Sequence, residues 1–433
     1  MSISTVSPLL KIGLSLIGIW PDASHGTLRW VFYMATLFVM QYFQYSYVYA
    51  HLDFNNLTKL MDGLGLVLDY TLTMLKLLSF WINRRIFADI LAAMEDDWKD
   101  CVTDFRKYVM TDKANLAQRC SNVLISVNAV STFLYFIDSY VRGRVLSIDG
   151  QFQEFPVQVQ FPPEVYKTPI YELVGVGVFF HVLETAIVIA LLNALILTLA
   201  LHVSGQIEIM CQELKEIPFM SKSSLLFTKS LVARHQKIIS LSKNIENFFS
   251  FVALLQFIWN TFVICALGFM AVISLDMNME SKSGILIQFI MPYLAVTMEA
   301  FVFCFVGEYL STKSKSIGDA VYEMVWYNLS TSECRILLFV IFRSQKQLTI
   351  TAGKVMDLTL ESFTTSKSIG DAAYETLWYD LSTNECRILL LIIVRSQKRL
   401  TITAGKVMDL TLEGFTTVMK ASASYVSVLH AMY

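Results

Sequence analysis

Charged residues are scarce in this chain of 433 residues. Asp, Glu, Lys and Arg make up 16% of the sequence, whereas soluble domains carry roughly 25%. Hydrophobic residues reach 55% and the mean hydropathy is +0.53. A soluble chain of this size would need a very large core to hide so much apolar surface. The composition therefore argues against a soluble protein, and the net charge of −2 gives no sign of a nucleic-acid partner.

Signatures of catalysis and metal binding are also missing. The sequence contains no glycine loop of the phosphate-binding type, no HExxH and no Gly-x-Ser-x-Gly. Its 6 histidines are scattered singly, and its 7 cysteines lack the spacing of metal ligands. We therefore predict no enzymatic activity, no cofactor and no metal site.

Long uncharged runs are the positive counterpart of the missing charge. Trp30–Ala50 and Phe248–Leu275 contain no charged residue at all. About 20 apolar residues in a helix cross the hydrocarbon core of a bilayer. The sequence thus predicts an all-α membrane protein with seven transmembrane helices. The predicted spans are 30–50, 64–82, 123–141, 173–202, 248–275, 285–308 and 412–432.

Lysine and arginine are distributed unevenly over the connections between these spans. The connections 83–122, 203–247 and 309–411 hold 25 of them, and the connections 51–63, 142–172 and 276–284 hold 5. Basic residues favour the cytoplasmic side. The N-terminus is therefore predicted to be cytoplasmic and the C-terminus extracellular. No cysteine falls in an external connection, so we expect no structural disulfide.

The external connection 142–172 is rich in proline. It contains 4 of the 8 prolines of the chain: Pro156, Pro162, Pro163 and Pro169. Proline stiffens an extended chain. The segment is either a partly rigid lid on the extracellular side or a long linker without a function of its own.

A tandem repeat lies near the C-terminus. Residues 314–365 recur at 366–417, and 42 of the 52 positions are identical. Either an exon was duplicated recently, or two alternative exons are joined in one gene model. The apolar stretch Ile336–Phe342 is too short to cross a bilayer, so each copy is predicted to form a pair of cytoplasmic helices.

Three regions follow from this organisation. Residues 1–308 would form a six-helix ligand-binding region with cytoplasmic extensions, 309–365 the duplicated helix pair, and 366–433 the second helix pair with the last span. Only the second copy leads directly into Val418. We therefore expect it to dock, while the first copy loops out and leaves Ile336–Phe342 without partners.

The last span carries small and polar side chains on one face. Spacings of three and four residues place these side chains together: Thr417, Ala421, Ser424, Val428 and Met432. The face is small or polar toward the cytoplasm and apolar toward the outside. This pattern suits a pore with an apolar gate, or a stripe of small residues for helix packing. Lys420 lies at the edge of this face, and we expect its ammonium group to reach the cytoplasmic side.

Several separated motifs resemble the insect odorant receptor family. They are Gly18-Ile19-Trp20-Pro21, Phe161-Pro162-Pro163, Thr168-Pro169-Ile170-Tyr171-Glu172-Leu173, Ala373-Tyr374-Glu375, Leu377-Trp378-Tyr379, Arg387-Ile388-Leu389-Leu390, Ala404-Gly405-Lys406, Phe415 and Ser424-Tyr425-Val426-Ser427-Val428-Leu429. The final motif is similar to the odorant pattern and not to that of the sister gustatory family. The repeat departs from the family pattern.

The resemblance implies a function as well as a fold. It implies an odorant-gated, non-selective cation channel, a heterotetramer formed with the family co-receptor in the plasma membrane of olfactory sensory neuron dendrites. A small volatile odorant would bind within one subunit, and a cytoplasmic anchor domain would join the subunits. Val428 and Met432 would form the gate. The connection 203–247 lacks the long insertion of the co-receptor, so the chain resembles a ligand-specific (tuning) subunit.

An odorant pocket should be apolar with few polar groups. The outer halves of the second, third and fourth spans supply candidates: Tyr70, Thr73, Phe133, Phe136 and Phe180. Aromatic residues at helical spacing also serve packing, and periodicity alone does not show which helix faces meet.

Charges inside the predicted spans are costly and need partners. Asp69 and Lys76 share a face and could form an ion pair or separate polar contacts. His181 and Glu184 are too few for a metal, and a polar contact that fixes helix register is the favoured interpretation, with a ligand contact as the alternative. Glu299 is a similar case.

Two other classes compete with a receptor channel. A transporter would show inverted repeats and interrupted spans, whereas this repeat is tandem and predicted to be cytoplasmic. A G-protein-coupled receptor has its N-terminus outside, which the distribution of basic residues opposes.

Overall fold

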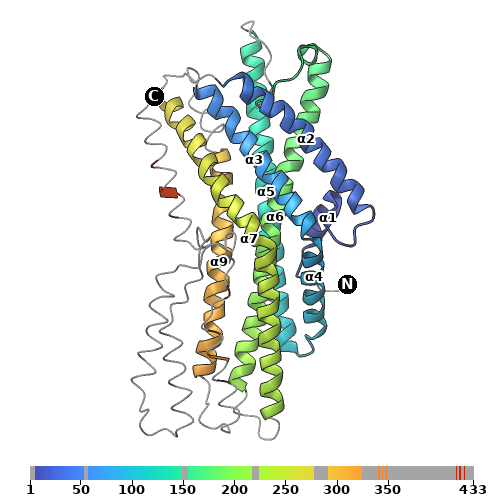
Figure 1. The fold of residues 1–433 in the computed structure, drawn as a ribbon, viewed down its shortest axis with the longest axis vertical. Coiled ribbons are helices and arrows are strands. Elements are labelled where there is room, and N and C mark those ends of the chain that lie inside the picture. Colours follow the sequence, from blue (N-terminus) through green and yellow to red (C-terminus); the bar gives the residue numbers. More distant parts are fainter. Residues whose placement is uncertain are drawn as a thin grey trace.

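The computed structural model describes residues 5–52, 57–148, 155–216, 224–276 and 291–323, and nine single positions between Leu337 and Ser424. Every regular element in these ranges is a helix. The α-helices are α1 (Pro8–Ile17), α2 (Gly26–Ala50), α3 (Leu57–Ile82), α4 (Arg84–Lys99), α5 (Asp104–Ile148), α6 (Ile170–Glu216), α7 (Ser224–Asp276) and α9 (Met291–Glu323), and η2 (Pro163–Tyr166) is a short 3₁₀ helix. Figure 1 shows the longest helices running along the long axis of the molecule. The predicted all-α class is confirmed for these residues.

Five helices in the described ranges are long and apolar enough to cross a membrane. They are Gly63–Ile82, Asp104–Ile137, Ile170–Lys215, Ser230–Val263 and Tyr293–Glu323. These helices contain or overlap the second to sixth predicted spans. Helix α2 covers the predicted span 30–50, but its tyrosines and glutamines make it less apolar than the five. The span 412–432 lies almost entirely outside the described residues, so the count of seven stays a prediction.

Helix α1 is fixed at both ends by its sequence. Ser7 caps the start, because its Oγ accepts a hydrogen bond from the backbone N–H of Leu10 at 3.1 Å, and Pro8 follows as the first helical residue. Gly18 ends the helix with φ of 85°. A Cβ at Gly18 would lie 2.1 Å from the carbonyl oxygen of Gly26. The turn from α1 into α2 therefore requires glycine.

The long helices continue well beyond the predicted spans. Helices α5, α6 and α7 contain 45, 47 and 53 residues, whereas about 20 residues cross a bilayer. The predicted connections 83–122 and 203–247 are thus largely helical where they are described. The sequence-based ends of the spans follow hydropathy, but the backbone continues as helix because no proline interrupts it in these described stretches, and Gly205 is accommodated within α6.

Ion pairs join the polar ends of these helices. On α6, Glu213 accepts a hydrogen bond from Arg106 Nε of α5 at 2.6 Å and lies 3.7 Å from Arg234 Nε of α7. Glu208 lies 2.9 Å from Lys113 of α5 and 3.7 Å from Lys313 of α9. Outside the apolar segments, the bundle is therefore held together by charge as well as by packing.

Helix α6 is the centre of the bundle. In the most apolar stretch of α6, 83% is buried inside the chain. The helix contacts α1, α5, α7 and α9. A Cβ at Gly13 would lie 2.5 Å from Leu191 Cδ1, so α1 packs closely against the middle of α6. A helix that is apolar on all sides suits this central position.

The proline-rich segment 155–169 packs against one end of α2, α5 and α6. The side chains of Phe155, Val157 and Val159 are buried. The backbone N–H of Gln160 donates to the carbonyl of Phe43 on α2 at 3.2 Å, and the ring of Phe155 lies 4.6 Å from that of Tyr171. The segment is thus packed against the bundle, and the choice between a lid and a linker without a function of its own stays a prediction.

The first copy of the repeat behaves differently from the sequence-based expectation. Its first ten residues, 314–323, are part of helix α9 and do not start a new helix. Leu337 and Val340, in the apolar stretch expected to lose its partners, are buried in the main core. The backbone N–H of Leu348 donates to Ser314 Oγ at 3.2 Å. The prediction that the first copy loops out is wrong, because α9 offers an apolar face directly beside it. The second copy lies outside the described residues up to Phe415.

Candidate functional site

A cluster of aromatic and polar side chains lies where α2, α3 and α6 meet. The ring of His181 on α6 lies 5.9 Å from that of Tyr70 on α3 and 6.5 Å from that of Tyr33 on α2. The hydroxyl of Tyr33 donates to Thr185 Oγ1 at 3.4 Å. Tyr33, Tyr70 and Thr185 are all buried. Three helices thus bring polar side chains together inside an apolar bundle.

Two polar atoms of this cluster lack a hydrogen-bond partner among the described residues. They are the hydroxyl oxygen of Tyr70 and Nε2 of His181, and both are buried. A buried polar group without a partner is costly. A small guest molecule with one polar group would satisfy these atoms.

The five predicted pocket residues divide into two groups. Tyr70, Thr73 and Phe136 are buried, with exposed fractions of 2%, 1% and 6%. Phe133 and Phe180 are 51% and 61% exposed and point out of the chain. The sequence gives the helical period but not the face that meets a neighbour, so it could not separate these two groups.

Phe136 connects α5 to α6 beside the cluster. Its ring lies 5.1 Å from that of Phe179, edge to face. The neighbouring Tyr135 donates from its hydroxyl to the carbonyl of Pro156 at 2.9 Å. The proline-rich segment is therefore tied to the same part of α5. Its packing limits access to the bundle from that end.

A buried ion pair joins α3 to α9. The ammonium group of Lys76 pairs with the carboxylate of Glu299, and the two side chains are 1% and 5% exposed. Lys76 therefore pairs with Glu299 of another helix and not with Asp69. Sequence spacing suggested Asp69 because it shares a face with Lys76, but the tertiary structure supplies a closer carboxylate.

His181 and Glu184 lie in different surroundings. Glu184 is exposed, and no hydrogen bond joins the two side chains. His181 instead turns toward Tyr33 and Tyr70. Thr185 and Tyr33 were missed by the sequence analysis, although Thr185 follows His181 by four residues and so shares its face.

Comparisons with known proteins identify the family. The sequence pattern described as 7tm Odorant receptor matches residues 56–365 and 364–423. This chain belongs to the insect odorant receptor family. Its relatives in Drosophila melanogaster include Odorant receptor 22c, 22% identical over 78% of this chain and 88% of the relative, and Odorant receptor 82a, 23% identical over 77% and 88%.

The fold is also that of an insect odorant receptor. The solved structure of the olfactory receptor OR5 from Machilis hrabei in complex with eugenol superimposes with a TM-score of 0.68, at 12% identity, over 89% of this chain and 96% of that chain. The structure of OR5 without eugenol in its title gives a TM-score of 0.63. Odorant receptors are multi-pass membrane proteins that bind ligands, which confirms the prediction of a receptor and not an enzyme.

A second polar cluster of this odorant receptor lies toward the other end of the bundle. His202 on α6 is fully buried, and its Nε2 donates to Asp97 Oδ2 of α4 at 3.0 Å. Its Nδ1 lies 2.9 Å from Thr5 Oγ1, and Thr5 Oγ1 accepts from Trp98 Nε1 at 3.0 Å. Lys237 on α7 completes the cluster, 2.7 Å from Asp97 Oδ1.

The electrostatics of this cluster favour an ionised carboxylate. Burial by itself would raise the pKa of Asp97, but the hydrogen bonds and charges of His202 and Lys237 outweigh it and hold that pKa below its usual value. The cluster thereby joins the N-terminal segment, α4, α6 and α7 of the odorant receptor. Nothing in the sequence predicted it, because its members come from four separate segments: Thr5 and Trp98 are 93 residues apart, and Asp97 and His202 are 105 residues apart.

Of the five residues predicted to line the pore of the odorant receptor, the structure describes only Ser424. Ser424 is helical and exposed, as is Lys420 four residues earlier, whereas Met419 is partly buried against the core. Thr417, Ala421, Val428 and Met432 lie outside the described residues. Among the residues that are described, no group of three or more His, Cys, Asp or Glu could hold a metal ion.

Proposed function

We propose that this odorant receptor is the ligand-specific subunit of an odorant-gated, non-selective cation channel. It would form a heterotetramer with the family co-receptor in the plasma membrane of olfactory sensory neuron dendrites. Family membership over most of the chain and the fold shared with a eugenol-binding insect receptor support this proposal. The connection 203–247 lacks the long insertion of the co-receptor, which supports a ligand-specific subunit.

The odorant would bind where α2, α3 and α6 meet. The observation that carries this proposal is the pair of buried, unpartnered atoms, Tyr70 Oη and His181 Nε2, within an aromatic cluster. In this proposal the buried side chains of Thr73 and Phe136 would also line the site, and residues 155–169 would cover it. A volatile molecule with a hydroxyl or carbonyl group would bury its apolar part among the rings and pair its polar atom with these two side chains.

The last helix would line the pore. Ser424 faces away from the core of its own chain, as expected for a side chain that faces a central axis shared by four subunits. Val428 and Met432 would form the apolar gate, and Thr417 and Ala421 the wider cytoplasmic vestibule. Seven spans with a cytoplasmic N-terminus complete this arrangement.

Co-expression with the co-receptor tests the function directly. Cells that express both chains are exposed to a panel of volatile alcohols, ketones and phenols while inward current is recorded. Epitope tags at the C-terminus and within 320–360 are read on intact and permeabilised cells. Current without selectivity among monovalent cations and external staining of only the C-terminal tag are expected. A signal that required a G protein, or surface staining of the internal tag, would contradict the proposal.

A further inference from the structure

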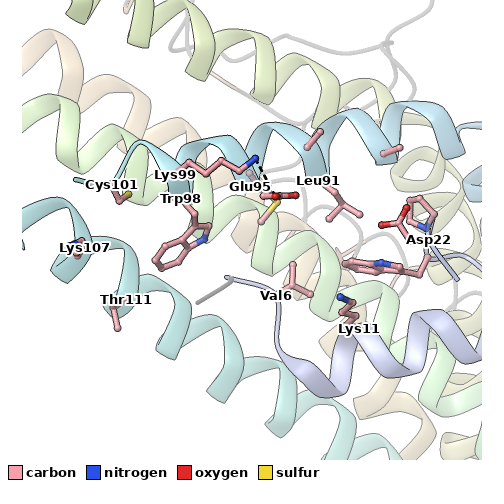
Figure 2. Close-up of a pocket in the computed structure, with 15 residues that line it drawn as sticks. Val6, Lys11, Asp22, Leu91, Glu95, Trp98, Lys99, Cys101, Lys107 and Thr111 are labelled. Carbon is pink, nitrogen blue, oxygen red and sulfur yellow. Dashed lines mark ion pairs between the residues drawn. The ribbon is translucent and has the colours of Figure 1, made fainter. Parts of the chain in front are cut away.

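A half-open groove lies between the N-terminal segment, α4 and the start of α5, away from the proposed odorant site. Its volume is about 810 Å³, which is within the usual range for a small-molecule site. Figure 2 shows Val6, Lys11 and Asp22 on one side of it and Leu91, Glu95 and Trp98 on the other. Its lining combines apolar side chains such as Val6, Leu91 and Met94 with charged ones such as Lys11, Glu95 and Lys99.

The two walls of the groove differ in a way that places it at a membrane boundary. Helix α1 is apolar on both sides: Leu10 and Leu14 are buried against the bundle, and Leu9, Ile12 and Leu16 are exposed. Helix α4 is amphipathic and turns charged side chains outward. A helix whose only charged residue is Lys11 suits the edge of the hydrocarbon, and a charged helix face suits water. The groove therefore lies where the bilayer meets the cytoplasm in the predicted orientation.

Tryptophan and basic side chains gather at this level. Trp20 lines the groove, with its ring edge-on to Phe87 at 5.8 Å and the Lys11 ammonium group 5.5 Å from its centroid. Nearby, Trp30 stacks on Trp81 at 4.6 Å. Tryptophan prefers the region of the lipid headgroups, where its ring is half in apolar surroundings.

The charges at the rim are only partly compensated. Lys99 is paired with Glu95 and Asp96, at 3.2 Å each. Lys11 and Lys107 have no carboxylate partner among the described residues, and Asp22 is the one unpaired acid that lines the groove. Two free ammonium groups thus face one free carboxylate. This balance favours an anionic guest with an apolar part.

We propose that the groove binds an anionic phospholipid of the cytoplasmic leaflet. The phosphate would lie at Lys11 above Trp20, the remaining headgroup would extend toward Lys107, and an acyl chain would cover the apolar part of the lining and leave along the exposed side of α1. This proposal rests on the membrane orientation but not on odorant gating. A free phosphate would leave the apolar part of the lining exposed, and a zwitterionic lipid would leave one ammonium group without a partner.

Lipid retention by the purified full chain tests the proposal. The protein is delipidated in detergent, offered equal amounts of phosphatidylserine and phosphatidylcholine, and examined by native mass spectrometry. Phosphatidylserine should be retained preferentially. Each neutralised lysine should weaken its retention about fivefold, as expected for a basic residue near a membrane surface, in the variants Lys11→Gln and Lys107→Gln.

Two further variants separate this site from general charge effects. Lys167→Gln removes an exposed lysine on the covering segment 155–169 and should leave retention unchanged. Ala88→Phe fills the groove without altering any charge and should abolish the preference, which keeps the test decisive if a lysine variant folds poorly. Equal retention of both lipids, a loss as large in Lys167→Gln, or displacement of the lipid by inorganic phosphate alone would overturn the proposal.

Discussion

The carboxylate of Asp97 on α4 lies 3.0 Å from Nε2 of His202 on α6. The side chains of His202 and Asp97 are 0% and 6% exposed. The hydrogen bonds of this cluster form one chain through the imidazole of His202. Trp98 donates to Thr5, the Thr5 hydroxyl can donate to Nδ1 of His202, and Nε2–H donates to Asp97. The N-terminal segment is therefore held to α4 and α6 by one continuous network.

Replacing Asp97 tests the stability that this network provides. Asp97→Asn keeps the shape but removes the charge that Lys237 and His202 face, so the free energy of unfolding should fall by about 1–3 kcal/mol. The melting temperature of the purified protein at neutral pH measures the effect. Asp96→Asn alters the exposed acid directly before Asp97 and should change the melting temperature far less.

The same variant predicts a pH dependence. The pKa of Asp97 is lowered in the folded protein, so its contribution is fully present above the unfolded pKa of about 3.9 and is lost as pH falls through the folded value. The difference in melting temperature between wild type and Asp97→Asn should therefore persist from neutral pH to about pH 5 and shrink in stronger acid. A difference that grew on acidification would show that Asp97 is not ionised in the network.

The Lys76–Glu299 pair should show strong coupling between α3 and α9. Removing either partner leaves an unpaired buried charge, which costs about 3–5 kcal/mol. Surface expression of Lys76→Met and of Glu299→Leu should therefore collapse. The double variant should recover a large part of it, because no charge remains unpaired. Additive losses in the double variant would mean that the two residues act independently.

The copies of the repeat offer a matched pair of substitutions. Leu337 is 3% exposed in the core, and Leu389 is its equivalent in the second copy. Leu337→Asp should lower the folded yield sharply, since a buried charge without a partner is costly. Leu389→Asp should be tolerated better, because the place in the core is already filled. Yields measured by fluorescence-detected gel filtration check this, and the reverse order would show that the second copy occupies that place.

Odorant responses should depend on the polar atoms of the proposed pocket. Tyr70→Phe and His181→Phe each remove one hydrogen-bonding group and should raise the half-maximal concentration of an activating alcohol or phenol about tenfold, the effect of roughly 1.4 kcal/mol. Responses to purely hydrocarbon volatiles should not weaken. Tyr42→Phe alters a tyrosine that is 67% exposed and serves as the control. Equal shifts for both odorant classes would exclude a direct polar contact.

The proposed gate can be tested at Val428. Val428→Ala widens an apolar ring that closes by dewetting, so basal current should rise or the ratio of cation permeabilities should change. Surface labelling is measured in parallel to exclude altered expression. Unchanged currents at equal surface density would argue against Val428 as a pore-lining residue.

The sequence by itself determined the class of this protein. Long uncharged runs predict helices that cross a bilayer, because about 20 apolar residues in a helix match the thickness of its hydrocarbon core. The length of the apolar runs predicted the second to sixth spans. Short motifs such as Gly18-Ile19-Trp20-Pro21 indicated the family. These features are local, so they can be read along the chain without knowing what each helix faces.

The tertiary structure decided which side chains meet. Tyr70 and Phe180 looked equivalent in the sequence, yet one is buried beside His181 and the other points out of the chain. Lys76 forms an ion pair with Glu299, which is 223 residues away, and not with Asp69 on its own helix. Helical period fixes the relative angle of residues on one helix but not the rotation of that helix against its neighbours. Packing of the whole bundle sets that rotation, and with it every contact that makes a site.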